Sequence, residues 1–112
     1  MEETLNILLI KSNRMMDIAL SDVLPGCGET INFLSAPVGF NQEALLGFIS
    51  VVDVVIVTNE TDIEKYSEFF NEMIYVGDEY GHVDIRGCKH VRLYLHQTKE
   101  EWKSELEKAL GV

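Results

Sequence analysis

The chain has few basic residues, few cysteines and no long apolar run, and each shortage argues against a class of function. Nine lysines and arginines stand against nineteen acidic residues, which gives a formal net charge of −10. Nucleic-acid binders and proteins that lie on anionic membranes need clustered positive charge, so we expect neither a nucleic acid nor a membrane as partner. Two cysteines make no disulfide framework. The apolar runs fall well short of the ~20 residues that a membrane-spanning helix needs.

Motifs for nucleotide binding, hydrolysis and metal binding are missing too. The turn after the first apolar run, at residues 11–14, lacks the glycines that let a backbone approach a pyrophosphate. The sequence contains no Gly-x-Ser-x-Gly nucleophile motif. Four residues of metal-ligating type, His82, Asp84, Cys88 and His90, match no standard zinc spacing, and we interpret them as part of a polar loop. We therefore expect no metal and no cofactor.

The most apolar stretch, residues 51–59, reads Val-Val-Asp-Val-Val-Ile-Val-Thr-Asn. Its β-branched residues do not alternate with polar ones, which is typical of a strand that is covered on both faces in a parallel sheet. Ligands of such sheets gather at the carboxyl ends of the strands. Thr58 and Asn59, where the run turns polar, are therefore the first candidates for a functional site.

Apolar runs and segments of helical period alternate along the rest of the chain. We expect further strands at residues 5–10, 31–36, 73–77 and 91–95, and helices that begin near residues 13, 41, 61 and 98. Two capping boxes, residues 61–64 and 98–101, predict the starts of the third and last helices. We expect the third helix to continue to Phe69 and Phe70, which share an apolar face with Ile63 and Tyr66. Gly111 is a natural C-terminal stop. Residues 78–90 form either a short helix or a loop.

This alternation predicts a single α/β domain over residues 1–112. We expect a three-layer α/β/α sandwich with a five-stranded parallel sheet, because right-handed crossovers place helices on both sheet faces. Lys11 and Thr58 should then converge on adjacent strands at the carboxyl edge of the sheet. The first residues, Met1-Glu2-Glu3, lack the basic start of a signal peptide, so we expect a cytoplasmic protein.

Three stretches resemble parts of one protein family. Residues 6–16 resemble the first strand of that family, which in the family ends in an acidic pair. Residues 54–58 resemble its third strand, which in the family ends in the phosphorylated aspartate. Residues 87–97 resemble its small-residue turn and fifth strand. This is the pattern of the response-regulator receiver domain of two-component signal transduction, which has a flavodoxin-like fold. The resemblance covers nearly the whole chain in length and element order, including the last helix with Trp102.

The chain departs from the receiver pattern at the residues that perform phosphoryl transfer. Lys11 and Ser12 stand where the resemblance implies the acidic pair that binds Mg²⁺, and Thr58 stands at the position of the phosphoaccepting aspartate. Transfer to aspartate needs a carboxylate nucleophile and carboxylates for the metal. The resemblance therefore implies a pseudo-receiver, which keeps the scaffold and is not an enzyme.

Two further pocket positions differ from the family. The lysine that ends the fifth strand is replaced by His96 or Gln97, and the hydroxyl at the end of the fourth strand falls near Val76 or Gly77, which carry none. Together with Asn59, these residues complete a degenerate receiver pocket.

Without phosphorylation, the resemblance implies a signalling module that acts by docking or dimerisation. Its partner would be another protein or an adjacent domain of a larger signalling or assembly protein. The interface would use the fifth strand and last helix, through Arg92, Tyr94, Lys99 and Trp102, where both signs of charge are present. We expect any homodimer to form there, around Tyr94, since the third helix is mostly acidic.

Two alternatives remain open. A small-ligand or anion sensor would bind at the carboxyl ends of the strands through Lys11, Ser12, Thr58 and Asn59. A hydrolytic enzyme would use Thr58 with His96 as its base, and we rank it last because one threonine and one histidine are a weak pattern.

Overall fold

A computed structural model of the chain describes residues 5–11, 14–27, 31–36, 47, 50–66, 68–70, 72–77, 88–94 and 96–111. The strands are β1 (Leu5–Ile10), β2 (Ile31–Ala36), β3 (Val54–Val57), β4 (Met73–Gly77) and β5 (Cys88–Arg92). The helices are α1 (Arg14–Val23), the 3₁₀ turn η1 (Leu24–Gly26), α3 (Glu60–Tyr66) and α4 (Lys99–Leu110). None of the helices described is long and apolar enough to cross a membrane.

The five strands form one parallel sheet in the order β2-β1-β3-β4-β5. β1 and β3 lie in the interior of the sheet, and their side chains from Ile7 to Ile10 and from Val54 to Val57 are all at most 3% exposed. Burial on both faces explains why these strands are apolar without alternation. The predicted α/β class and parallel sheet are confirmed.

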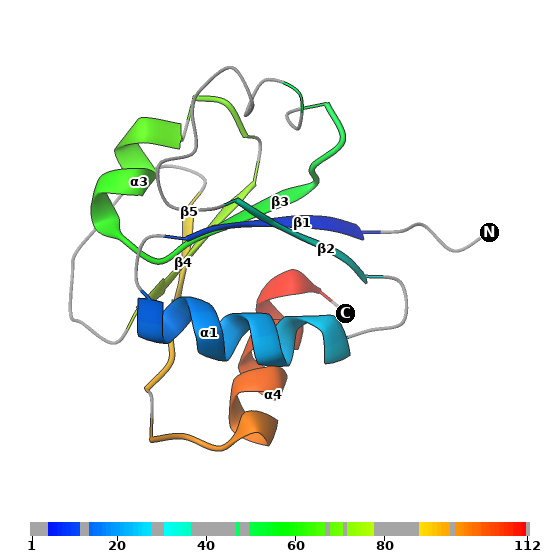
Figure 1. Cartoon of the computed structure of the whole chain (residues 1–112), viewed down its shortest axis with the longest axis vertical. Helices are drawn as coiled ribbons and strands as arrows, with labels where there is room; N and C mark the ends of the chain where they lie inside the picture. The colour runs from blue at the N-terminus through cyan, green and yellow to red at the C-terminus, as the bar shows by residue number, and fades with distance from the viewer. Residues whose placement is uncertain are drawn as a thin grey trace.

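Apolar side chains form a cluster on each face of the sheet, because successive residues of a strand point to opposite sides. Ile7, Leu9 and Ile56 pack with α1 and α4 on one face. Leu8 and Val57 pack with α3 on the other face. Figure 1 shows α3 across the sheet from α1 and α4. The second predicted helix falls on residues of which only Gly47 and Ser50 are described, so the complete three-layer sandwich stays a prediction.

Two hydrogen bonds join β1 to the residue before β3 at the amino edge of the sheet. The backbone amide of Asn6 donates to Oδ2 of Asp53 over 2.8 Å, and the amide of Asp53 donates to the carbonyl of Asn6 over 2.8 Å. Asp53 is the one charged residue of the apolar stretch, and this contact fixes the register of the two central strands.

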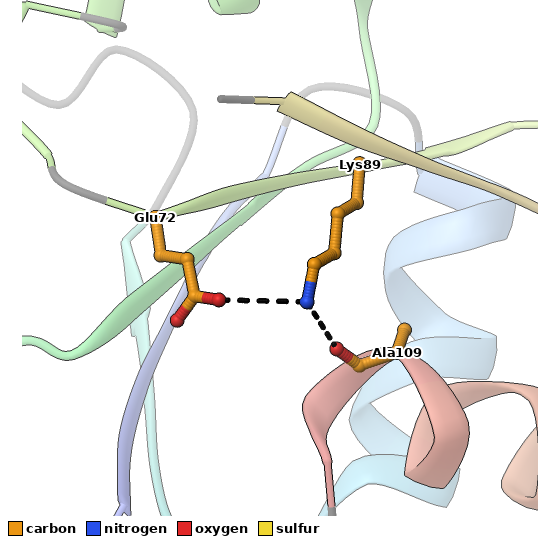
Figure 2. A network of polar contacts seen from close by, with 3 residues as sticks. All are labelled: Glu72, Lys89 and Ala109. Carbon is orange, nitrogen blue, oxygen red and sulfur yellow. Dashed lines mark hydrogen bonds and ion pairs between the residues drawn. The ribbon is translucent and has the colours of Figure 1, made fainter. Parts of the chain in front are cut away.

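The end of α4 is fixed at the same edge. The Lys89 ammonium donates to the carbonyl oxygen of Ala109 over 3.2 Å and lies 3.5 Å from a carboxylate oxygen of Glu72 (Figure 2). Carbonyls of a last helical turn have no partner within the helix and favour a nearby cation. Gly111 then ends the helix in a left-handed conformation at φ 76°, as predicted.

Two predicted boundaries are wrong. The fifth strand spans Cys88–Arg92, three residues before the predicted 91–95, so Cys88 and His90 belong to a strand and not to a polar loop. His82 and Asp84 lie outside the described residues. The third helix begins at Glu60 and ends at Tyr66, whereas Phe69 and Phe70 were expected to continue it. Those two phenylalanines still pack on the α3 side of the sheet.

Cys27 follows η1 and is buried, with its thiol donating to the carbonyl of Val23 over 3.5 Å. Burial raises the pKa of this thiol above its ordinary value, and nearby Glu107 adds to the effect. The thiolate is the reactive form, so Cys27 is inert in the folded protein at neutral pH. Because the pKa of Cys27 is higher in the folded than in the unfolded chain, its thiol contributes fully to the free energy of unfolding at any pH below the pKa of a free thiol. This contribution is lost as the pH rises to the pKa that the thiol has in the folded protein.

We predict that Cys27 reacts with a thiol reagent only when the chain unfolds. In a Cys88→Ser variant at neutral pH, labelling should be slower than that of a free cysteine by about 10³-fold or more, and denaturant should accelerate it in step with unfolding. The reaction is followed by absorbance or mass spectrometry. Rapid labelling in plain buffer would contradict the burial of this side chain.

Candidate functional site

The candidate site lies where β1 and β3 end. Ile10 of β1 pairs with Val57 of β3, so Lys11 and Thr58 directly follow paired positions on adjacent parallel strands. Their predicted convergence at the carboxyl edge of the sheet is confirmed. Lys11 is half-buried and Thr58 is buried. Ser12, the other residue predicted after β1, lies outside the described residues.

A buried hydrogen bond occupies this edge. The hydroxyl of Thr58 donates to Oδ1 of Asp17 over 2.9 Å, and each of the two residues is only 4% exposed. They are the buried polar residues of the described chain, and they join α1 to the end of β3 across 41 positions of sequence. The Thr58 hydroxyl hydrogen is thereby engaged by a carboxyl oxygen.

Sequence reasoning missed Asp17, although a signal for it exists. Asp17 lies three residues before Leu20 and seven before Leu24, both fully buried, so it shares the inward face of α1. An acidic residue on an apolar helical face must find a partner, because a buried polar group without one is costly. Its position in the first turn of α1 is electrostatically favourable as well.

Asn59 caps α3. Its Oδ1 accepts hydrogen bonds from the backbone amide of Thr61 over 3.0 Å and from the Thr61 hydroxyl over 2.9 Å. The predicted capping box at residues 61–64 is therefore wrong, because the cap lies two residues earlier and Thr61 is inside the helix. Asn59 is exposed, but its carbonyl oxygen serves the helix end.

Gly77 ends β4 under the ring of Tyr75. A Cβ at position 77 would lie 2.7 Å from the Tyr75 hydroxyl oxygen and 2.9 Å from Cζ. Tyr75 is buried, and its ring contacts that of His90 at a centroid distance of 4.9 Å. The close approach requires glycine here. The same contact places the hydroxyl of Tyr75 at the end of β4, where Val76 and Gly77 carry no hydroxyl of their own.

His96 and Gln97 do not lie at the end of a strand. β5 ends at Arg92, and both residues fall in the turn before α4, so their predicted position at the end of the fifth strand is wrong. Gln97 accepts from the Tyr94 amide over 2.7 Å and its side chain donates to Glu101 over 3.3 Å. The exposed His96 ring stacks on Tyr94 at 5.5 Å. Thr58 donates to Asp17, and no contact with His96 is found in the described part of the chain.

The residues predicted for an interface have different environments. Trp102 is 3% exposed and its indole nitrogen donates to the Tyr94 carbonyl over 2.8 Å, so it offers almost no surface to a partner. Tyr94 is half-buried. Lys99 is exposed and binds Asp22 of α1; this hydrogen bond raises the pKa of the lysine above its ordinary value. Arg92 lies in β5, and its side chain is outside the described residues.

Among the hollows lined by residues that the structure describes are two that Thr58 does not line. One of about 170 Å³ lies between α1 and α4 and is lined by Ala19, Asp22, Gln97, Lys99 and Trp102. A second of about 620 Å³ lies between β5 and the end of α4. Within the residues that the structure describes, no group of three or more His, Cys, Asp or Glu side chains could hold a metal ion.

Comparison with known proteins gives no relative: no family model, no curated protein and no solved structure matches the chain.

We predict that Asp17 and Thr58 are energetically coupled. Thr58→Val should lower the free energy of unfolding by about 1–3 kcal/mol, because it leaves a buried acceptor short of a donor. Asp17→Asn should cost less than Asp17→Ala, since the amide oxygen can still accept. In the double variant Asp17→Ala/Thr58→Val, the loss should be smaller than the sum of the single losses by at least about 0.5 kcal/mol. Denaturant unfolding measures all four values, and additive losses would contradict a direct interaction.

We also predict that Gly77→Ala destabilises the fold by about 1–3 kcal/mol, because the new methyl group overlaps the Tyr75 ring. Gly26→Ala is the matched control, since nothing lies within 4 Å of a Cβ there. Tyr75→Leu removes the atoms in conflict, so Gly77→Ala should cost less in that background. An equal cost in both backgrounds would locate the conflict elsewhere.

Proposed function

We propose that this chain is a non-enzymatic, receiver-like signalling module that acts in the cytoplasm by docking to a protein partner or to an adjacent domain. Its strand order supports this reading, because β1 and β3 lie side by side and end at one edge. The residues that follow them are Lys11 and Thr58, and neither is a carboxylate. A receiver needs a carboxylate in each place to bind Mg²⁺ and to accept the phosphoryl group.

The hydrogen bond from Thr58 to Asp17 carries the proposal. The side chain that stands where the nucleophile would be is 4% exposed, and its hydroxyl already donates to a carboxyl oxygen. An attacking group must reach its substrate at close range. A buried, engaged hydroxyl at this edge supports a structural role, which leaves the outer surfaces of the domain to carry function.

The same hydrogen bond weakens the alternative of an anion sensor. Anion sites present hydrogen-bond donors, such as backbone amides, lysine or hydroxyl groups. Thr58 has donated its hydrogen to Asp17, and Asp17 adds acceptor oxygens to the edge. Lys11 is the one described cation that directly follows a strand there, and a single half-buried lysine makes a weak site.

We predict that neither acetyl phosphate nor beryllofluoride with Mg²⁺ changes the protein. The mass should stay constant and the amide ¹H–¹⁵N spectrum should be the same with Mg²⁺ alone and with beryllofluoride added. The reason is the absence of a carboxylate after β1 and β3. Saturable, Mg²⁺-dependent shifts centred on Lys11, Thr58 or Asp17 would overturn the proposal.

A further inference from the structure

Two large apolar side chains are exposed next to each other on α1. Met15 is 65% exposed and Ile18 is 62% exposed, and a spacing of three residues makes them neighbours on the helix surface. Single exposed apolar residues are common on soluble proteins. Here, however, two of the three large hydrophobic residues exposed in the described chain share one helix of ten residues.

The hollow between α1 and α4 borders this apolar pair. Ala19, in its lining, follows Met15 by four positions, and Asp22 follows Ile18 by four, so each lies directly beside an exposed apolar residue on the helix. The buried Trp102 of α4 also lines the hollow. With a volume of about 170 Å³, the hollow is large enough to receive one apolar side chain. One face of the molecule therefore offers both projecting side chains and a recess.

The charges at this face are balanced. Asp22 lies in the last turn of α1, where the negative end of the helix dipole disfavours an acidic side chain. This last turn contains no basic residue of its own. Lys99 of α4 compensates by pairing with it. The exposed surface of α3 is different, since Glu64 and the following Glu68 face solvent with Lys65 as the neighbouring base. A partner attracted by charge alone would bind such an acidic surface and not the α1 face.

We infer that the outer face of α1, formed by Met15, Ile18 and the adjacent hollow, is a self-association surface that takes a second copy of this chain. The two α1 helices pack antiparallel across a twofold axis near Ile18, so that the same patch serves both copies. In this arrangement Met15 of one copy faces the end of α1 that carries the hollow in the other. Asp22 of each copy also comes near the first turn of the other α1, where the dipole favours an acid.

This inference names a partner for the docking function proposed above and rests on it. The patch is small, and each copy carries a net charge of −10. We therefore expect a weak dimer, with a dissociation constant in the micromolar to millimolar range. Added salt should strengthen the association, because it screens the repulsion between two anionic copies.

Sedimentation equilibrium with matched variants tests the surface. Ile18→Glu buries a charge at the twofold axis and should weaken association by about tenfold or more. Val51→Glu is the control, since Val51 is 51% exposed outside α1, and it should leave association unchanged apart from a small charge effect. Tyr94→Glu probes the surface around β5 and α4, where the sequence alone predicts any homodimer to form. The α1 surface replaces that prediction, so this variant should have little effect. Amide spectra establish that each variant is folded.

Cysteine cross-linking provides an independent geometric test. In the Cys88→Ser background, with Cys27 protected in the core, Ile18→Cys places two thiols close together across the twofold axis. A disulfide requires about 4.4–6.8 Å between the two Cα atoms, which two residues at the twofold axis can reach. Mild oxidation should therefore give a disulfide-linked dimer. Val51→Cys should cross-link much more slowly.

The outcomes separate this inference from the function it rests on. A chain that stays monomeric at millimolar concentration, a dimer that Ile18→Glu leaves intact, or a dimer that Tyr94→Glu dissociates instead would overturn the α1 surface. Those results leave the non-phosphorylated docking function standing as long as beryllofluoride has no effect. A saturable beryllofluoride response would overturn that function, whichever result sedimentation gives.

Discussion

The pairing of β1 with β3 is the constraint on which the rest of the structure depends. Its register, set from Ile7↔Val54 to Ile10↔Val57, fixes which residues end at the same edge. A shift of one residue would turn the buried side chains of a strand to the opposite face, and both faces here carry a packed apolar cluster. The contact of Asp53 with Asn6 holds this register at the amino edge. Lys11 and Thr58 meet at the other edge as a consequence.

Where burial dominates, the sequence predicts the fold closely. The strands at 5–10, 31–36 and 73–77 were predicted with the bounds that the structure has. Two of them, 5–10 and 73–77, are mostly apolar and buried runs that follow a polar residue and end before one. The cap of α4 at Thr98 was also recognised, since its hydroxyl accepts from the amide of Glu101 as a capping box requires. These features are local, so the residues that decide them are close together in the chain.

Errors arose where the pattern depends on distant contacts. β5 is an edge strand that begins with Cys88, Lys89 and His90, and these mostly polar residues do not look like the start of a strand. Its bounds are set by pairing with Met73 to Gly77 of β4. The error at α3 is local instead: Asn59 and Thr61 are both residue types that can cap a helix, and in the structure Asn59 is the one that accepts the hydrogen bonds. Asp17 is the clearest case of a distant contact. Its place on the inward face of α1 indicates that it needs a partner, but the sequence does not show that this partner is Thr58, 41 positions away.

The rotation of α1 links the buried site to the exposed surface. At about 100° per residue, Met15 and Asp17 lie roughly 160° apart around the helix. Turning the helix to bury Met15 and Ile18 would gain about 1.5–3 kcal/mol for each side chain. It would also expose the buried Met16, Leu20 and Val23 and would separate Asp17 from Thr58. Three apolar side chains and a buried hydrogen bond outweigh two apolar side chains, so α1 keeps Asp17 inward. The exposure of Met15 and Ile18 thus follows from the burial of Met16, Leu20 and Val23 together with the contact of Asp17 with Thr58 at the carboxyl edge of the sheet.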